Sequence, residues 1–211
     1  MTNAIKSLEG FMMKKFLVLI IGISLMALGT SICNTTGLGI DPFNALSVAF
    51  SDLFAIQLGT MVLLLQALLG IFVLVFDRKK LGLGSLVPMI AFGYFLQFFN
   101  WFIPRLIVVN QNWVFSVFIF FIGMLIIAIG MSTYMECEVG MVPYDCLSFV
   151  IGERINKNPF TFRIAIDITV AILAFVLGGP INIGTVLLAF FTGPLINYFR
   201  KKLPRQLFVI N

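Results

Sequence analysis

The chain contains 211 residues, of which 60% are hydrophobic and only 11% are charged. Soluble domains carry about 25% charged residues, so this composition excludes a water-facing protein and predicts an integral membrane protein whose outside meets lipid. The formal net charge of +5 does not indicate nucleic acid binding, because the basic residues stand between apolar runs, where anionic lipid head groups are the expected partners.

The apolar runs predict transmembrane helices, because a helix needs about 20 apolar residues to cross the hydrocarbon core. Two further segments, 41–55 and 142–157, are too short to span. We therefore predict an all-α membrane protein, a single membrane domain over residues 1–211, with six transmembrane helices and these two short segments. In chain order, the six predicted spans cover residues 15–34, 58–76, 83–103, 113–135, 160–177 and 183–199.

The second half of the chain repeats the first half. An offset of 101 residues aligns Phe16–Phe76 with the later sequence without a gap, and it places GIDPFNALS, from Gly39, on GMVPYDCLS, from Gly140. The polar, glycine and proline matches carry this alignment, because apolar residues match by chance in any two membrane helices. We predict two structural repeats, residues 14–103 and 113–202.

The distribution of positive charge predicts how these repeats are inserted. If the short segments do not cross the bilayer, each repeat has three crossings, and the two repeats are inverted. With the N-terminus in the cytoplasm, all of the 14 lysines and arginines except Arg105 then lie on the cytoplasmic side. Eight crossings would place Arg78, Lys79 and Lys80 outside. The prediction is an inverted repeat with both termini cytoplasmic.

A Gly-x-x-Pro motif opens each short segment. Gly39 and Pro42 form it in the first repeat, and Gly140 and Pro143 form it in the second. Proline at the first helical position favours a helix start, so each motif predicts a break followed by a new helix. Asp41 is suited to cap the first of these helices, whereas valine at the corresponding place in the second cannot cap.

Polar residues follow one face of each short helix. Asn44 and Ser47 lie one turn apart in the first repeat, and Asp145 and Ser148 take the same places in the second. A helix of this length covers about half the bilayer. Each segment is therefore either re-entrant, lining a pathway, or an amphipathic helix lying in the interface, and the sequence leaves both open.

Asp167 lies midway along the fifth predicted span, where an acidic residue is a functional candidate by default. Arg163 precedes it by one helical turn, so the two side chains are within reach of each other. A structural ion pair and a role in substrate or proton binding are both consistent with this spacing. Gln66 occupies the equivalent place in the first repeat. We group these three with the four polar residues above as candidates for a substrate or ion pathway.

No pattern in the sequence predicts an enzyme, a cofactor or a metal site. The chain has no histidine, and its three cysteines, Cys33, Cys137 and Cys146, form no metal-binding or disulfide spacing. Neither a nucleophile–base pair nor a phosphate-binding glycine loop is evident.

Three stretches together resemble a known group of proteins. They read GLGIDPFNALS, VGMVPYDCLSFVIGERI and GGPINIGTVLLAFFTGPLINYF. In this combination they are similar to the YczE/YyaS/YitT group of bacterial membrane proteins, and within it to the YczE/YyaS-like branch. The resemblance implies a bacterial plasma membrane protein with the two Gly-x-x-Pro segments as its recurring motif, and it implies no substrate.

The inverted duplication and the interrupted polar segments favour a small-molecule transporter or permease, with a small-molecule ligand of unknown identity. A non-transporting membrane scaffold or assembly factor is one alternative. The substrate-binding membrane subunit of a multi-component importer is another. A homodimer or a membrane partner protein fits any of the three.

Overall fold

The computed structural model describes residues 2–76, 85–107, 113–137, 141–156 and 159–202, with their side chains except at 2–12, 149 and 159–161. This part of the chain is all α-helical. Its helices, in chain order, are α1 (Thr2–Thr35), α2 (Pro42–Phe54), α3 (Leu58–Phe76), α4 (Leu86–Leu106), α5 (Trp113–Glu136), α6 (Pro143–Arg154), α7 (Pro159–Val176) and α8 (Ile183–Lys202).

Five of the described helical stretches are long and apolar enough to cross a membrane: Met13–Thr35, Leu58–Phe76, Leu86–Leu106, Trp113–Glu136 and Ile183–Lys202. They coincide with five of the six spans predicted from the sequence. α7 coincides with the remaining predicted span but is not one of the five. Large apolar side chains on these helices, such as Leu68, Ile71 and Trp113, are exposed on the outside of the bundle, as contact with lipid requires.

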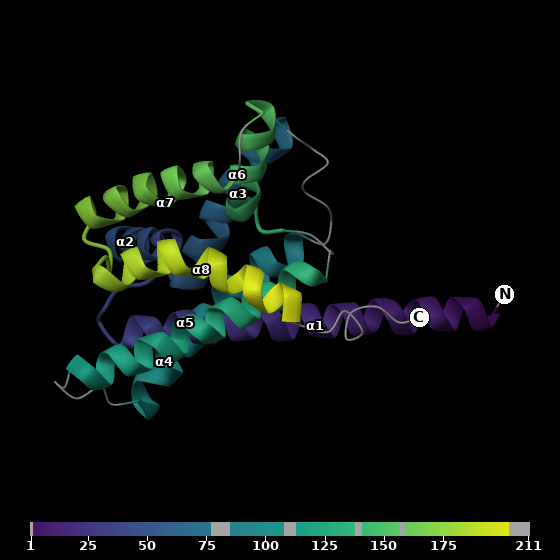
Figure 1. Cartoon of the computed structure of the whole chain (residues 1–211), viewed down its shortest axis with the longest axis horizontal. Helices are drawn as coiled ribbons and strands as arrows, with labels where there is room; N and C mark the ends of the chain where they lie inside the picture. Colours follow the sequence, from purple (N-terminus) through teal and green to yellow (C-terminus); the bar gives the residue numbers. More distant parts are fainter. Residues whose placement is uncertain (1, 77–84, 108–112, 138–140, 157–158, 203–211) are drawn as a thin grey trace.

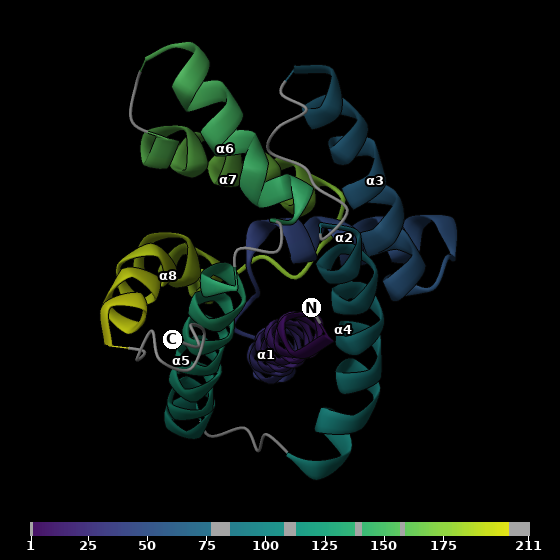
Figure 2. The same ribbon diagram turned by 90° about the vertical axis from the view of Figure 1, so that its right-hand side faces the viewer.

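α1 and α5 pack closely against each other, and glycines allow their backbones to meet. A Cβ atom added to Gly29 would lie 2.6 Å from the carbonyl oxygen of Gly123, and one added to Gly130 would lie 2.7 Å from that of Gly22. No larger residue fits at such distances. These glycines serve the close packing that small residues give in membrane bundles. Figure 2 looks along α1 and shows α4 and α5 on either side of it.

The short helices α2 and α6 begin inside the protein and end at its surface. α2 is buried from Pro42 to Ser47, whereas its last residues, such as Leu53, are exposed. α6 likewise has a buried first turn, including Tyr144, and an exposed last turn. The first turns of both helices meet, since the rings of Phe43 and Tyr144 lie 4.7 Å apart between centroids.

Local sequence explains where α2 and α6 start. Pro42 and Pro143 occupy the first helical turn of their helices, where the missing N–H costs nothing. The carboxylate of Asp41 accepts the backbone N–H of Asn44 at 3.1 Å, which confirms it as the N-cap of α2. Val142 caps α6 without a side-chain hydrogen bond.

Each short helix packs against helices from both halves of the chain. α2 contacts α3 and α7, and α6 contacts α7 and α3. The segment before α2 also pairs with the chain that follows α7. The backbone N–H of Ile40 donates to the carbonyl of Pro180, and the backbone N–H of Gly184 donates to the carbonyl of Leu38. In Figure 1 the start of α1 and the end of α8 point to the same side of the bundle.

Candidate functional site

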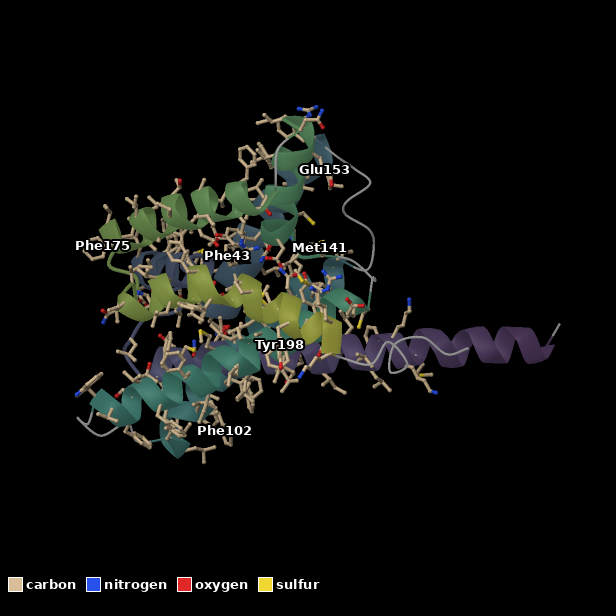
Figure 3. The ribbon with its side chains drawn as sticks, in the orientation of Figure 1. Phe43, Phe102, Met141, Glu153, Phe175 and Tyr198 are labelled. Carbon is tan, nitrogen blue, oxygen red and sulfur yellow. The ribbon has the colours of Figure 1, made fainter. Side chains whose placement is uncertain are left out.

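A cavity of about 570 Å³ lies where the first turns of α2 and α6 meet. α1, α3, α4, α5, α7 and α8 supply the rest of its wall. Phe43, labelled near the middle of the molecule in Figure 3, is on this wall, whereas Phe102 and Phe175 lie on the outside. Of the candidate pathway residues, the cavity is lined by Asn44, Gln66, Asp145, Ser148, Arg163 and Asp167.

Arg163 binds two carboxylates at once. Its Nη1 lies 2.6 Å from Oδ1 of Asp145 on α6, and its Nε lies 3.2 Å from Oδ2 of Asp167 on its own helix. The two aspartate side chains are almost fully buried, and the arginine side chain is 30% exposed. The ion pair expected from the i,i+4 spacing is present, and Asp145 extends it into a cluster across two helices.

Two tyrosines donate hydrogen bonds to the same carboxylates. The hydroxyl of Tyr134 on α5 donates to Oδ2 of Asp145 at 3.1 Å and accepts the backbone N–H of Val142 at the same distance. The hydroxyl of Tyr144 on α6 donates to Oδ1 of Asp167. Because charged acceptors form stronger hydrogen bonds than neutral ones, the tyrosines fix both carboxylates in place.

A third carboxylate stands at the start of α2. Asp41 accepts the side-chain amide of Asn44 at 2.6 Å in addition to the backbone N–H of that residue. The amide nitrogen of Asn44 is therefore turned toward Asp41, and the carbonyl oxygen of the same side chain has no hydrogen-bond partner within the described part of the chain. Asn44 is only 3% exposed, so this oxygen is a buried and unsatisfied acceptor on the cavity wall.

Gln66 connects the two halves of the chain at this site. Its side-chain oxygen on α3 accepts the backbone N–H of Tyr144, at the start of α6, at 3.2 Å. That N–H belongs to the first turn of α6 and has no partner within the helix. Gln66 therefore caps α6 from outside the helix, which Val142 cannot do.

Much of the remaining cavity lining is apolar. It includes Met26 on α1, Met131 and Met135 on α5, and Leu188 on α8. α1 and α8 also contribute the polar residues Thr30, Thr192, Asn197 and Arg200. Methionine is flexible and adapts to ligands of different shape. A mostly apolar lining with a few polar and charged groups is common for small-molecule pockets.

The remaining predicted residues have structural positions. Ser47 is fully buried and donates to the carbonyl of Phe43, but it is not among the residues that line the cavity. Gly39 has a φ of +98°, and an added Cβ would lie 2.5 Å from the hydroxyl of Thr185, so only glycine fits there. Gly140 lies outside the described residues, and Pro143 starts α6.

Sequence reasoning did not identify Tyr134, Tyr144 or Asp41 as cavity residues. The repeat alignment contained a signal for Tyr144, because it falls on Phe43 with an added hydroxyl and the aligned pair sits at the break of each repeat. Tyr134 carried no such signal. Its role depends on α5 passing the first turn of α6, which only the packing reveals.

The site contains no group of three or more histidine, cysteine, aspartate or glutamate side chains placed to hold a metal ion, as far as the described residues extend. Cys33, Cys137 and Cys146 are buried, and none of them forms a disulfide bond. The described groups on the cavity wall offer a ligand charge, hydrogen bonds and apolar contact.

Comparison with known proteins yields relatives over most of the chain. "Uncharacterized membrane protein YczE" of Bacillus subtilis is 29% identical over 191 residues, covering 90% of this chain and 86% of the relative. "Uncharacterized protein YyaS" of the same organism is 28% identical over 185 residues, covering 88% and 92%. An "Uncharacterized protein" of Haemophilus influenzae is 29% identical over 189 residues, covering 88% and 83%.

No solved structure matches the chain. A family described as "Family of unknown function (DUF6198)" matches residues 13–201. The resemblance to YczE and YyaS seen in the motifs is thereby confirmed. The chain belongs to this family, DUF6198, and is a multi-pass integral membrane protein with bacterial relatives.

Proposed function

We propose that the protein is a small-molecule transporter or permease, without a catalytic step, whose substrate site is the cavity between the first turns of α2 and α6. The observation that carries this proposal is the buried Arg163 cluster on a cavity of about 570 Å³. Buried charge is costly in a membrane protein and usually marks a substrate or ion site. Transporters built from inverted repeats bind their substrates at such interrupted helices.

The proposal includes six crossings, with α7 as the one beyond the five described above, and an inverted repeat. Pairs of contacts support the inverted repeat. When each residue of one contact is replaced by its equivalent at the offset of 101 residues, the result is a second contact that is also present. The approach of Gly22 to Gly130 becomes, under that offset, the approach of Gly123 to Gly29, and both occur. The pairing of α2 with α7 likewise corresponds to that of α6 with α3. Such exchange is what a pseudo-two-fold axis between two repeats produces.

The ring contact between Phe43 and Tyr144 supports the same axis. These residues are equivalent in the repeat alignment, and equivalent residues touch each other only near a two-fold axis. The cavity lies beside this contact. A site on the axis of an inverted repeat is equally far from both membrane faces, so rocking of the two halves would open it to either side in turn. In this proposal the two chain termini are cytoplasmic, as the positive charges favour.

Two serines at equivalent positions test whether the cavity opens to both sides. Ser148 and Ser47 are both buried, but only Ser148 lines the cavity. Ser148→Cys and Ser47→Cys would be made in a background in which Cys33, Cys137 and Cys146 are alanine. Each variant is then treated with a membrane-impermeant maleimide in intact cells and in inverted vesicles.

A transporter predicts that the Ser148→Cys variant reacts from both sides of the membrane, because each conformation exposes the cavity to one side. The Ser47→Cys variant should react from neither side. Reaction at position 148 from only one side, or from neither, would contradict transport and favour a scaffold whose cavity does not change its access.

A further inference from the structure

The cavity carries an excess of negative charge. Asp41, Asp145 and Asp167 line it, and Arg163 is the cation that binds two of them. The other basic residue on the wall, Arg200, is held by Glu136, with its Nε 2.8 Å from the carboxylate.

Two helix N-termini reduce this excess without removing it. The first turns of α2 and α6 face the cavity, and each helix N-terminus acts as about half a positive charge. When all three carboxylates are ionised, they exceed one guanidinium and two such half-charges by about one negative charge. Burying one uncompensated charge is strongly unfavourable, so the free site is suited to a ligand that brings one positive charge.

A second observation favours a ligand that also donates hydrogen bonds. Asn44 lines the cavity, and its side-chain carbonyl oxygen is buried and lacks a donor among the described groups. An ammonium group, with several N–H donors and no acceptor, fits this requirement.

The apolar part of the cavity lining favours a ligand whose body, apart from the charged group, is apolar. Met26, Met131, Met135 and Leu188 offer no hydrogen bonds to a polar body, and a hydrophilic ligand would lose its water there without compensation. Apolar and aromatic groups pack well against methionine.

We propose that the cavity binds a small organic monocation, a protonated amine with an apolar body, whose ammonium group pairs with the carboxylate of Asp41, beside Asn44. This inference rests on the proposed function, since it names the substrate class of the same site.

Binding of three nearly isosteric probes to the purified protein tests the ligand class. Phenethylammonium carries the positive charge, 2-phenylethanol is neutral, and 3-phenylpropionate is negative. Isothermal titration calorimetry in detergent should show binding of phenethylammonium, and about tenfold or more weaker binding of the other two, because a charged hydrogen bond is lost.

Two matched variants locate the site. Asp41→Asn removes the carboxylate charge but keeps a good N-cap, so α2 stays folded, and phenethylammonium should bind about tenfold more weakly. Asp52→Asn makes the same change at an exposed position of the same helix, and binding should be unchanged. Equal loss in both variants would place the amine outside the cavity.

The other outcomes are equally decisive. Tightest binding of 3-phenylpropionate would show that Arg163 and the helix N-termini dominate, and equal binding of the alcohol would show that charge is not selected. Absence of binding by phenethylammonium and cyclohexylammonium alike would overturn the inference. Two-sided reactivity of the Ser148→Cys variant without amine binding would remove the substrate class and keep transport. Amine binding together with one-sided reactivity of that variant would keep the substrate class and contradict transport.

Discussion

At the scale of single residues, Arg163 is the centre of the site. Its pair with Asp167 was predictable, because residues four apart lie together on a helix. Its closer contact, with Asp145, was not predictable, because the two residues stand on different helices and only the packing of α6 against α7 brings them together. The sequence had indicated Asp145 and Arg163 separately, each as a candidate residue of a substrate or ion pathway. Their joint action is a property of packing.

Removing the positive charge should destabilise the protein. In an Arg163→Met variant, Asp145 and Asp167 would keep their tyrosine partners but lose the cation that both of them bind. Breaking a buried ion pair in this way costs about 3 kcal/mol or more. We expect a clearly lower thermal unfolding midpoint in detergent micelles.

Arg154→Met is the control for this measurement. Arg154 lies at the exposed end of α6, with its guanidinium 5.0 Å from the ring of Phe76, and such a contact is worth only about 0.5–1 kcal/mol. Similar unfolding midpoints for the two variants would mean that the buried cluster does not stabilise the fold.

At the scale of helices, composition and proline placement predicted most of the structure. The starts of α2 and α6 follow from Pro42 and Pro143, and five described spans coincide with apolar runs. Helix ends were less certain. α1 begins at Thr2, well before its predicted apolar run, because a helix can continue through polar residues, where hydropathy carries no signal. The burial of the first turns of α2 and α6 inside the protein followed only from the structure.

The crossing of α1 and α5 should not tolerate a methyl group. Gly29→Ala would place a Cβ 2.6 Å from the carbonyl oxygen of Gly123 and 2.7 Å from the backbone nitrogen of Ile127. Backbone cannot move aside as a flexible side chain does, so the two helices must separate. Overpacking of this kind costs about 1–3 kcal/mol, and we expect a lower unfolding midpoint in detergent.

Gly70→Ala makes the same substitution within α3, where an added Cβ meets only side-chain atoms of Pro143, the nearer at 3.4 Å. Alanine is the better helix former by about 1 kcal/mol, so stability should be equal or higher. If Gly29→Ala were tolerated as well as Gly70→Ala, the close contact of α1 and α5 would not be essential for packing.

At the scale of the whole molecule, the proposed function depends on an opposite orientation of the two repeats. Under the proposed inversion, the exposed ends of α2 and α6 would lie on opposite faces of the membrane while their first turns meet at one cavity. Parallel repeats would bring both helices in from the same face, and the cavity would then be accessible from that face alone.

The most direct test of this claim uses two equivalent positions. Leu53 and Arg154 are exposed at the ends of α2 and α6 and are related by the same offset of 101 residues as Gly39 and Gly140. Single cysteines at these positions, in a background without the native cysteines, would be treated with an impermeant thiol reagent in intact cells and in inverted vesicles. The account predicts that Leu53→Cys reacts only in intact cells and Arg154→Cys only in inverted vesicles. Reaction of both variants from the same side would contradict the inverted repeat and, with it, the proposed route through the cavity.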